Sequence, residues 1–209
     1  MITGIDAITY GVEDVERCRR FFADWGLKEV RPGDFETLNG CEVKIRPRDD
    51  AALPPAMEAG STLREVVWAS EADLPAMTDP NGMALRFRRS RKRALEVKGV
   101  PANVWGEAAR IDRPAPFYPR AEPVEVGHLV LFTDRLADME RFYVERLGFI
   151  VSDRYPGRGL FLRCTPEGGH HDLFLLQTPA SKPGVNHVAF AVRDLYEVFG
   201  GGLHISRCG

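Results

Sequence analysis

The stretch IDAITYGVEDVERCRRFFADWGL, residues 5–27, decides the fold because a second stretch repeats its pattern. That second stretch is VGHLVLFTDRLADMERFYVERLGF, residues 126–149. Each begins with a short run typical of a β-strand, passes through an acidic turn, and continues with apolar residues at helical spacing. Each helix pattern stops at a glycine, Gly26 or Gly148, a residue suited to the positive φ that often follows a helix. A repeated pattern of this kind predicts a repeated structural unit.

Both helices are expected to bury one face, because their apolar residues recur at intervals of three and four. The predicted buried positions are Val15, Cys18, Phe21, Phe22 and Trp25 in the first helix, and Leu136, Met139, Phe142, Tyr143 and Leu147 in the second.

Three strand-like segments follow each helix, so the unit reads β-α-β-β-β. Antiparallel hairpins are expected at residues 38–41 and 166–169. Two shorter stretches, EVVWASEADL (65–74) and NHVAFAVRDL (186–195), match each other and mark further unit starts. The sequence therefore predicts an α+β fold in which paired βαβββ modules form two domains of curved mixed sheet, with helices outside.

The domain boundaries follow from the same spacing. We expect an N-terminal module pair at 1–95, a linker rich in proline, alanine and charge at 96–122, and a C-terminal domain at 123–209. The last module is expected to be incomplete, since residues 186–209 supply a strand, a helix and the start of another strand. Taking the repeat as a guide, roughly 60 further residues would complete it.

The composition fits a globular protein with a substantial core. Apolar residues make up 44% of the chain and charged residues 28%, and the net charge of −2 gives no reason to expect nucleic acid as a partner. No basic stretch followed by an apolar run opens the chain, and no apolar run approaches the ~20 residues of a membrane span. Four scattered cysteines without a CxxC pair favour reduced thiols in a cytoplasmic protein.

Two histidines occupy the same position of the repeat. His128 lies in the first strand of the third unit and His187 in that of the fourth, whereas the N-terminal units carry Ala7 and Val66 there. If the first strands of paired units come together, both imidazoles point into one cavity and begin a metal site, since neutral imidazole suits Zn, Fe, Cu or Ni. A pair of ordinary core histidines is the alternative.

The remaining histidines differ in the roles that the sequence predicts for them. His170 and His171 open a strand that is expected to neighbour the strand of His187. A histidine beside a metal can act as an acid or base at neutral pH; an exposed turn at GGHHD is an equally good interpretation. His204 is expected to be a peripheral strand residue.

With these residues in view, the chain resembles the vicinal oxygen chelate superfamily, and within it the type I extradiol catechol dioxygenases. The most specific motif is HHDLFLLQTP followed by VNHVAFAV. The resemblance implies that His128 and His187 are two ligands of an Fe(II) ion, with Mn(II) as the alternative metal. It also implies that His171 is the acid/base residue beside the metal and that Val130 lines the oxygen pocket.

The third ligand of that family is a glutamate on the last strand of the final unit, and no residue within 1–209 matches it. In the N-terminal counterpart Arg86 stands roughly at that position. Glu197 lies on the helix after His187 and is wrongly placed to substitute.

The resemblance implies a ring-cleavage reaction between O₂ and a catechol-type aromatic diol, as in the catabolism of aromatic hydrocarbons, by a homo-oligomeric enzyme. Phe132 and Phe190 are expected to supply an apolar wall for the ring. Two alternatives stay open: a glyoxalase-like metal-dependent isomerase, and a metal-free small-molecule-binding protein of the same fold.

Overall fold

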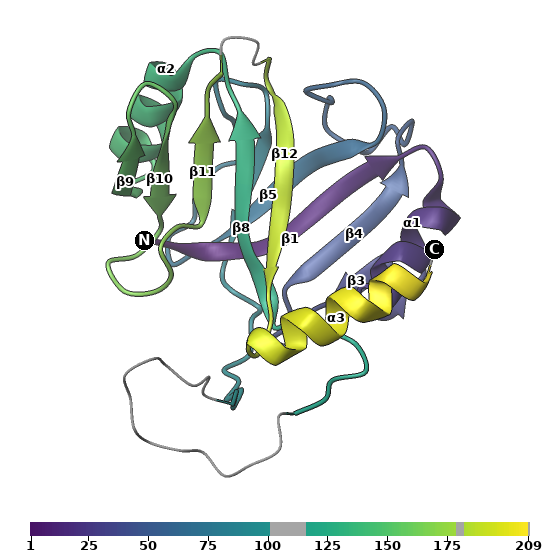
Figure 1. The fold of residues 1–209 in the computed structure, drawn as a ribbon. Coiled ribbons are helices and arrows are strands. Elements are labelled where there is room, and N and C mark those ends of the chain that lie inside the picture. Colours follow the sequence, from purple (N-terminus) through teal and green to yellow (C-terminus); the bar gives the residue numbers. More distant parts are fainter. Residues whose placement is uncertain (101–115, 179–181, 209) are drawn as a thin grey trace, which may run out of the picture.

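A computed structural model describes residues 1–100, 116–178 and 182–208 of the 209-residue chain. Two mixed β-sheets lie side by side, with short helices at their flanks and one longer helix near the C-terminal end (Figure 1). The expected α+β fold of βαβββ modules is confirmed.

The N-terminal part follows the predicted order and then continues with three more strands. Its elements are β1 (Ile2–Val12), α1 (Val15–Asp24), β2 (Lys28–Arg31), β3 (Asp34–Glu36), β4 (Glu42–Pro47), β5 (Thr62–Ser70), β6 (Met77–Thr78) and β7 (Ala84–Arg88). In the described chain no helix separates β5 from β6, so the second unit is a shortened one.

The C-terminal part repeats the unit. Its elements are β8 (Glu125–Phe132), α2 (Leu136–Glu140), the π-helical turn η1 (Arg141–Arg146), β9 (Ile150–Tyr155), β10 (Gly159–Arg163), β11 (Leu173–Leu176), β12 (Gly184–Ala191) and α3 (Leu195–Cys208). The two expected hairpins are present, because β3 pairs antiparallel with β4 and β10 with β11.

The sheet topology shows the internal repeat directly. The first sheet has the order β2-β3-β4-β1-β5-β7-β6 and the second has β12-β8-β11-β10-β9. In each, the first strand of the unit pairs parallel with the last strand of that unit and antiparallel with the first strand of the next. The first strands of paired units thus meet, as the sequence predicted.

Local signals at α1 explain its limits. The side chain of Asp14 accepts a hydrogen bond from the backbone N–H of Arg17 at 2.9 Å, which caps the helix N-terminus. Gly26 has φ of 97° just after the helix and Gly148 has φ of 77° after η1, as expected. Phe21, predicted to be buried, is 48% exposed, because the buried face centres on Phe22 and Phe21 lies beyond its edge.

A buried contact joins the two halves of the molecule. The Tyr143 hydroxyl donates to Asp79 Oδ2 at 2.9 Å, and both side chains are buried. Next to it Phe149 meets Trp68 edge to face, with ring centroids 5.1 Å apart. Asp79 is held in place by the N–H groups of Met83 and other residues of its turn. The turn that follows β6 and the π-helical turn η1 are therefore linked through a buried hydrogen bond.

The last unit differs from expectation. Residues 203–206 were predicted to start a strand, but they continue α3, so His204 is helical. Gly200 and Gly201 are buried in this helix against Tyr118 and Ala121, where there is no room for a side chain, so tertiary packing offsets the low helix propensity of glycine. The boundaries 1–95, 96–122 and 123–209 stay a prediction, and residues 101–115 of the linker lie outside the described residues. Among the described helices, none is long and apolar enough to cross a membrane.

Candidate metal centre

His128 and His187 meet across the antiparallel pair of β8 and β12. Their Nε2 atoms lie 3.2 Å apart. Two imidazole nitrogens that bind one ion at right angles, each about 2.1 Å away, lie about 3.0 Å from one another. The observed spacing therefore suits two ligands of a shared metal ion.

Strand alternation places both imidazoles on the same face of the sheet. Leu129 and Leu131 of β8 belong to the buried core, so His128 and Val130 point to the opposite face. Val130 is the register partner of His187, and an irregularity at Asn186 shifts the register of β12 immediately before that histidine. Irregularities of this kind re-aim side chains next to functional sites.

Burial and the neighbouring imidazoles keep His128 neutral. Desolvation, together with the nearby His171 and His187, lowers the pKa of His128 to about 4. Burial also lowers the pKa of His171, and the neighbouring His170 and His187 add to that effect. A metal ligand must offer a lone pair, so a histidine that is neutral at neutral pH is suited to that role.

Asn186 orients the second histidine. Its Oδ1 lies 2.6 Å from Nδ1 of His187, so the ring nitrogen donates to the amide oxygen. A proton on Nδ1 leaves the lone pair of the neutral ring on Nε2, the atom that faces His128. Hydrogen bonds to the far nitrogen of a ligating histidine commonly fix its tautomer in this way. Sequence reasoning missed Asn186, although its position next to His187 was a usable signal.

His171 lies beside this pair, but the strand that follows it has a different neighbour from the one predicted. Its ring centroid is 4.2 Å from that of His128. The sequence placed it next to the strand of His187, which is wrong: β11 pairs with β8, and β8 separates β11 from β12. His171 precedes β11, which begins at Leu173.

His170 lies next to His171 in the same irregular segment. Both residues lie before β11, in a turn, where strand alternation does not apply. Their Nδ1 atoms are 3.1 Å apart, and both rings contact Phe161 with centroids 5.0 Å away. His170 is nevertheless fully exposed, whereas His171 is half-buried against His128.

An aromatic pair borders the histidines. Phe161 of β10 stacks on Phe174 of β11, with centroids 4.0 Å apart and planes inclined by only 8°. Phe174 is in register with Val130, which is in register with His187, so one row runs across the sheet toward the second histidine. Sequence reasoning missed both rings. The alternation in GLFLR, with Leu160 and Leu162 in the core, indicated that Phe161 faces the other side.

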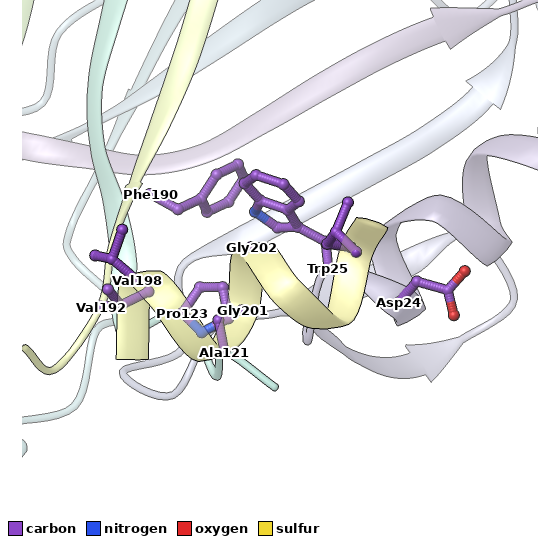
Figure 2. A pocket seen from close by; sticks show the side chains of 10 residues that line it. Asp24, Trp25, Ala121, Pro123, Phe190, Val192, Val198, Gly201 and Gly202 are labelled. Atoms are coloured by element: carbon purple, nitrogen blue, oxygen red, sulfur yellow. The ribbon is translucent and has the colours of Figure 1, made fainter. Parts of the chain in front are cut away.

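Phe190, expected in an apolar wall at this site, lies elsewhere. It packs against Trp25 with centroids 6.3 Å apart and lines an apolar cavity of about 290 Å³ between α1 and α3. Figure 2 shows the two rings together behind α3, with Val198 further along the helix. Phe132 borders a different hollow, near Met57. An irregularity between Ala189 and Phe190 shifts the register of β12 just before this ring.

The N-terminal counterpart of the site contains an ion pair. Thr9, which matches Val130 in the repeat, is in register with Glu65, so Glu65 and not Val66 corresponds to His187. Val66 points into the core. The registers of the two strand pairs are equivalent, and the difference arises because the sequence alignment of 65–74 with 186–195 is displaced by one residue. The Glu65 carboxylate lies 2.5 Å from Nε of Arg86, the residue at the position of the family's glutamate ligand.

Among the described residues, no aspartate or glutamate joins the two histidines into a three-donor group. The sequence indicated that Glu197 is wrongly placed to be the third ligand. It is buried on α3, where its carboxylate accepts hydrogen bonds from the N–H groups of Glu122 and Arg193. The described part of the chain therefore brings together two imidazole nitrogens at this place.

Comparison with known proteins agrees with the fold. Residues 125–200 match the family model described as the Glyoxalase/Bleomycin resistance protein/Dioxygenase superfamily. A curated relative, metapyrocatechase 2 of Cupriavidus necator, is 27% identical over 200 residues, which cover 93% of this chain and 58% of the relative. The chain thus spans less than two thirds of that relative's length.

Solved structures show the same fold. The Mn(II)-bound glyoxalase from Novosphingobium aromaticivorans superposes with a TM-score of 0.68 at 22% identity, over all of this chain and 71% of that one. The 2,3-dioxygenase LapB from Pseudomonas sp. KL28 gives 0.66 at 16% identity, over all of this chain and 82% of that one. These findings fit the vicinal oxygen chelate superfamily, which confirms the resemblance. The solved structures that resemble the chain include dioxygenases as well as a glyoxalase.

Proposed function

We propose that this protein is an extradiol ring-cleavage dioxygenase that acts with O₂ on a catechol-type aromatic diol. The observation that carries the proposal is the 3.2 Å separation of the Nε2 atoms of His128 and His187. The dioxygenase names of the curated relative and of several structural neighbours support the same reaction class.

The donors present fit a non-haem Fe(II) ion, with Mn(II) as the alternative. In a 2-His-1-carboxylate site, two imidazoles and one carboxylate leave open positions for substrates. His128 and His187 would be the two imidazole ligands, and Asn186 would hold the second in the tautomer that leaves Nε2 free. The carboxylate ligand is not among the described residues.

When bound, such an ion supplies a meeting point at which an electron-rich diol and O₂ are held in reacting geometry. The chain itself would manage protons and position the ring. His171 can hold or release a proton at Nε2, because its Nδ1 faces His170 and its Nε2 has no hydrogen-bond partner among the described residues. Its lowered pKa favours the neutral form, which accepts a proton from a substrate hydroxyl.

The stacked Phe161 and Phe174 rings offer an apolar wall beside the imidazoles. Aromatic rings prefer offset-stacked or edge-to-face contact with one another. A planar aromatic diol suits this wall better than a small aliphatic substrate does. This arrangement favours the dioxygenase over a glyoxalase-like isomerase, although one structural neighbour is a glyoxalase.

The paired imidazoles speak against a metal-free binding protein, because such a protein has no need to place two imidazole nitrogens at ligand spacing. All four cysteines are free thiols, in line with the reduced, cytoplasmic location that we propose. A homo-oligomeric assembly belongs to the same proposal.

The test is a direct assay of the protein expressed from its full gene. The protein is loaded anaerobically with Fe(II), mixed with catechol and air, and followed by O₂ uptake and by the absorbance of the ring-opened product. We expect stoichiometric O₂ consumption that is abolished in His128→Ala and His187→Ala. Conversion of a hemithioacetal without O₂ uptake would instead support the isomerase, and retention of a small aromatic without any metal would support the binding protein.

A further inference from the structure

A second group of metal-binding side chains lies where α1 and α3 end. We propose that Asp24, His204 and Cys208 bind a Zn²⁺ ion, independently of the histidine pair on the sheet. Their donor atoms all lie within 4.8 Å of one another. Asp24 is the last residue of α1, and Cys208 is the last of α3.

The spacing of the two α3 donors suits zinc. Residues four apart lie on the same face of a helix, so His204 and Cys208 are neighbours. The Nε2 atom of His204 is 3.5 Å from Sγ of Cys208. In a tetrahedral site with Zn–N near 2.05 Å and Zn–S near 2.3 Å, these two atoms would lie about 3.6 Å apart. The pair therefore needs almost no rearrangement to bind.

The third donor is available and comes from a different helix. The carboxylate of Asp24 is half-buried and makes no hydrogen bond or ion pair within the described residues. Sulfur, nitrogen and oxygen donors together match the ligand types of zinc, and three protein ligands leave one position for water. Mg²⁺ and Ca²⁺ prefer all-oxygen sites and fit this set poorly.

The backbone favours a cation at the same place. The C-terminal end of a helix carries partial negative charge from its unpaired carbonyl groups. The C-terminal end of α1 lies here, and this helix has no basic residue in its last turn. Arg207 is the basic residue in the last turn of α3. In Figure 1 the C-terminal end of α3 lies beside α1.

Packing holds α3 in position without any metal. A Cβ added at Gly200 would lie 2.3 Å from the carbonyl oxygen of Tyr118, so the helix approaches that segment too closely for a side chain. The buried carboxylate of Glu197 accepts from the backbone N–H groups of Glu122 and Arg193 at 3.0 and 2.6 Å. The donors of α3 are thus preorganised, which lowers the cost of binding an ion.

The site would join the two halves of the molecule. Asp24 belongs to the first module and α3 to the last, and the apolar cavity of Figure 2 lies between them. A bound ion would hold α3 against α1 and so stabilise the walls of this cavity. An ion that binds only the folded state raises the melting temperature, and the effect grows with the logarithm of the free ion concentration once this exceeds Kd.

Cobalt reports on the proposed site specifically. Co²⁺ bound by a thiolate gives a near-ultraviolet charge-transfer band, and the site at His128 and His187 contains no cysteine. We expect one equivalent of Co²⁺ to produce the band in the parent protein. The band should disappear in Cys208→Ser and persist in two controls, Cys18→Ser and His128→Ala. Absence of the band in the parent, or its persistence in Cys208→Ser, would overturn the proposal.

A second measurement separates a three-ligand site from a lone thiol. Competitive Zn²⁺ titrations should show affinity reduced more than about tenfold in both Asp24→Asn and His204→Ala. Zn²⁺ should also slow alkylation of the exposed Cys208 by iodoacetamide, whereas the buried Cys41, whose pKa burial raises to about 11, stays unreactive throughout. Parent-like zinc affinity in both variants would overturn the proposal.

Discussion

The Nε2 atoms of His128 and His187 lie 3.2 Å apart although 59 positions separate the two residues in the chain. Each histidine comes from the first strand of a different module. Because those strands pair antiparallel with each other, module duplication brings the two imidazoles together. In the N-terminal half the equivalent strands β1 and β5 carry Ala7 and Glu65, and Glu65 forms an ion pair with Arg86 of the neighbouring β7.

Replacing His171 by alanine should leave metal binding intact and lower the turnover number. The ring lies against His128 but is assigned no metal bond, and a positioned acid/base is worth about 10²–10⁴-fold in rate. The measurement is iron content together with steady-state catechol cleavage. His170→Ala is the matched control and should stay near the parent rate. Loss of iron from His171→Ala would make it a ligand and require a different set of donors.

Asn186→Ala should weaken metal binding by about 10–100-fold, because the hydrogen bond that fixes the His187 tautomer is lost. Asn186→Asp keeps an acceptor at the same place and should bind as the parent does. Titration calorimetry with Mn(II) under identical buffer measures both. In the metal-free protein, long-range ¹H–¹⁵N NMR should show the proton on Nδ1 of His187 in the parent. Equal metal affinity for the two variants would contradict the orienting role.

The metal-free protein should lose stability as the pH falls from about 6.5 toward 4. The pKa of His128 is lowered from 6.5 to about 4 in the folded state. Between these values the unfolded chain binds a proton that the folded chain does not, so acid favours unfolding. Above about 6.5 both states are neutral and the effect vanishes. Urea unfolding at several pH values should show a shallower slope in His128→Gln; an unchanged slope would argue against a depressed pKa.

Tyr143→Phe should destabilise the protein by about 1–3 kcal/mol, because it leaves the buried carboxylate of Asp79 without one of its donors. Tyr155→Phe is the control, since Tyr155 is 51% exposed and a surface change of this kind is usually within about 0.5 kcal/mol of neutral. Urea denaturation gives both values. Equal stability of the two variants would show that this hydrogen bond does not hold the halves together.

Much of the fold could be predicted because periodicity, helix-ending glycines and the internal repeat all indicated the same unit. The meeting of His128 and His187 followed from that repeat. One error arose because two short stretches were aligned one residue out of step. The registers of β1 with β5 and of β8 with β12 are equivalent, and they make Glu65 the counterpart of His187 where the alignment gave Val66.

Other features could not be predicted from the sequence, because they depend on which strands and helices become neighbours. The order of strands decides that His171 approaches β8 and not β12. Likewise, Phe190 turns toward Trp25 only because α1 and α3 pack together. Asp24, His204 and Cys208 are brought together by the same packing.

The central claim is that His128 and His187 share one metal ion, and anomalous X-ray scattering tests it most directly. Crystals grown anaerobically with Fe(II) would be measured on both sides of the iron absorption edge, using the Cys208→Ser variant so that the second site does not compete. We predict an iron peak within about 2.1–2.3 Å of both Nε2 atoms. Iron bound elsewhere, with the two imidazoles still hydrogen-bonded to each other, would contradict the claim.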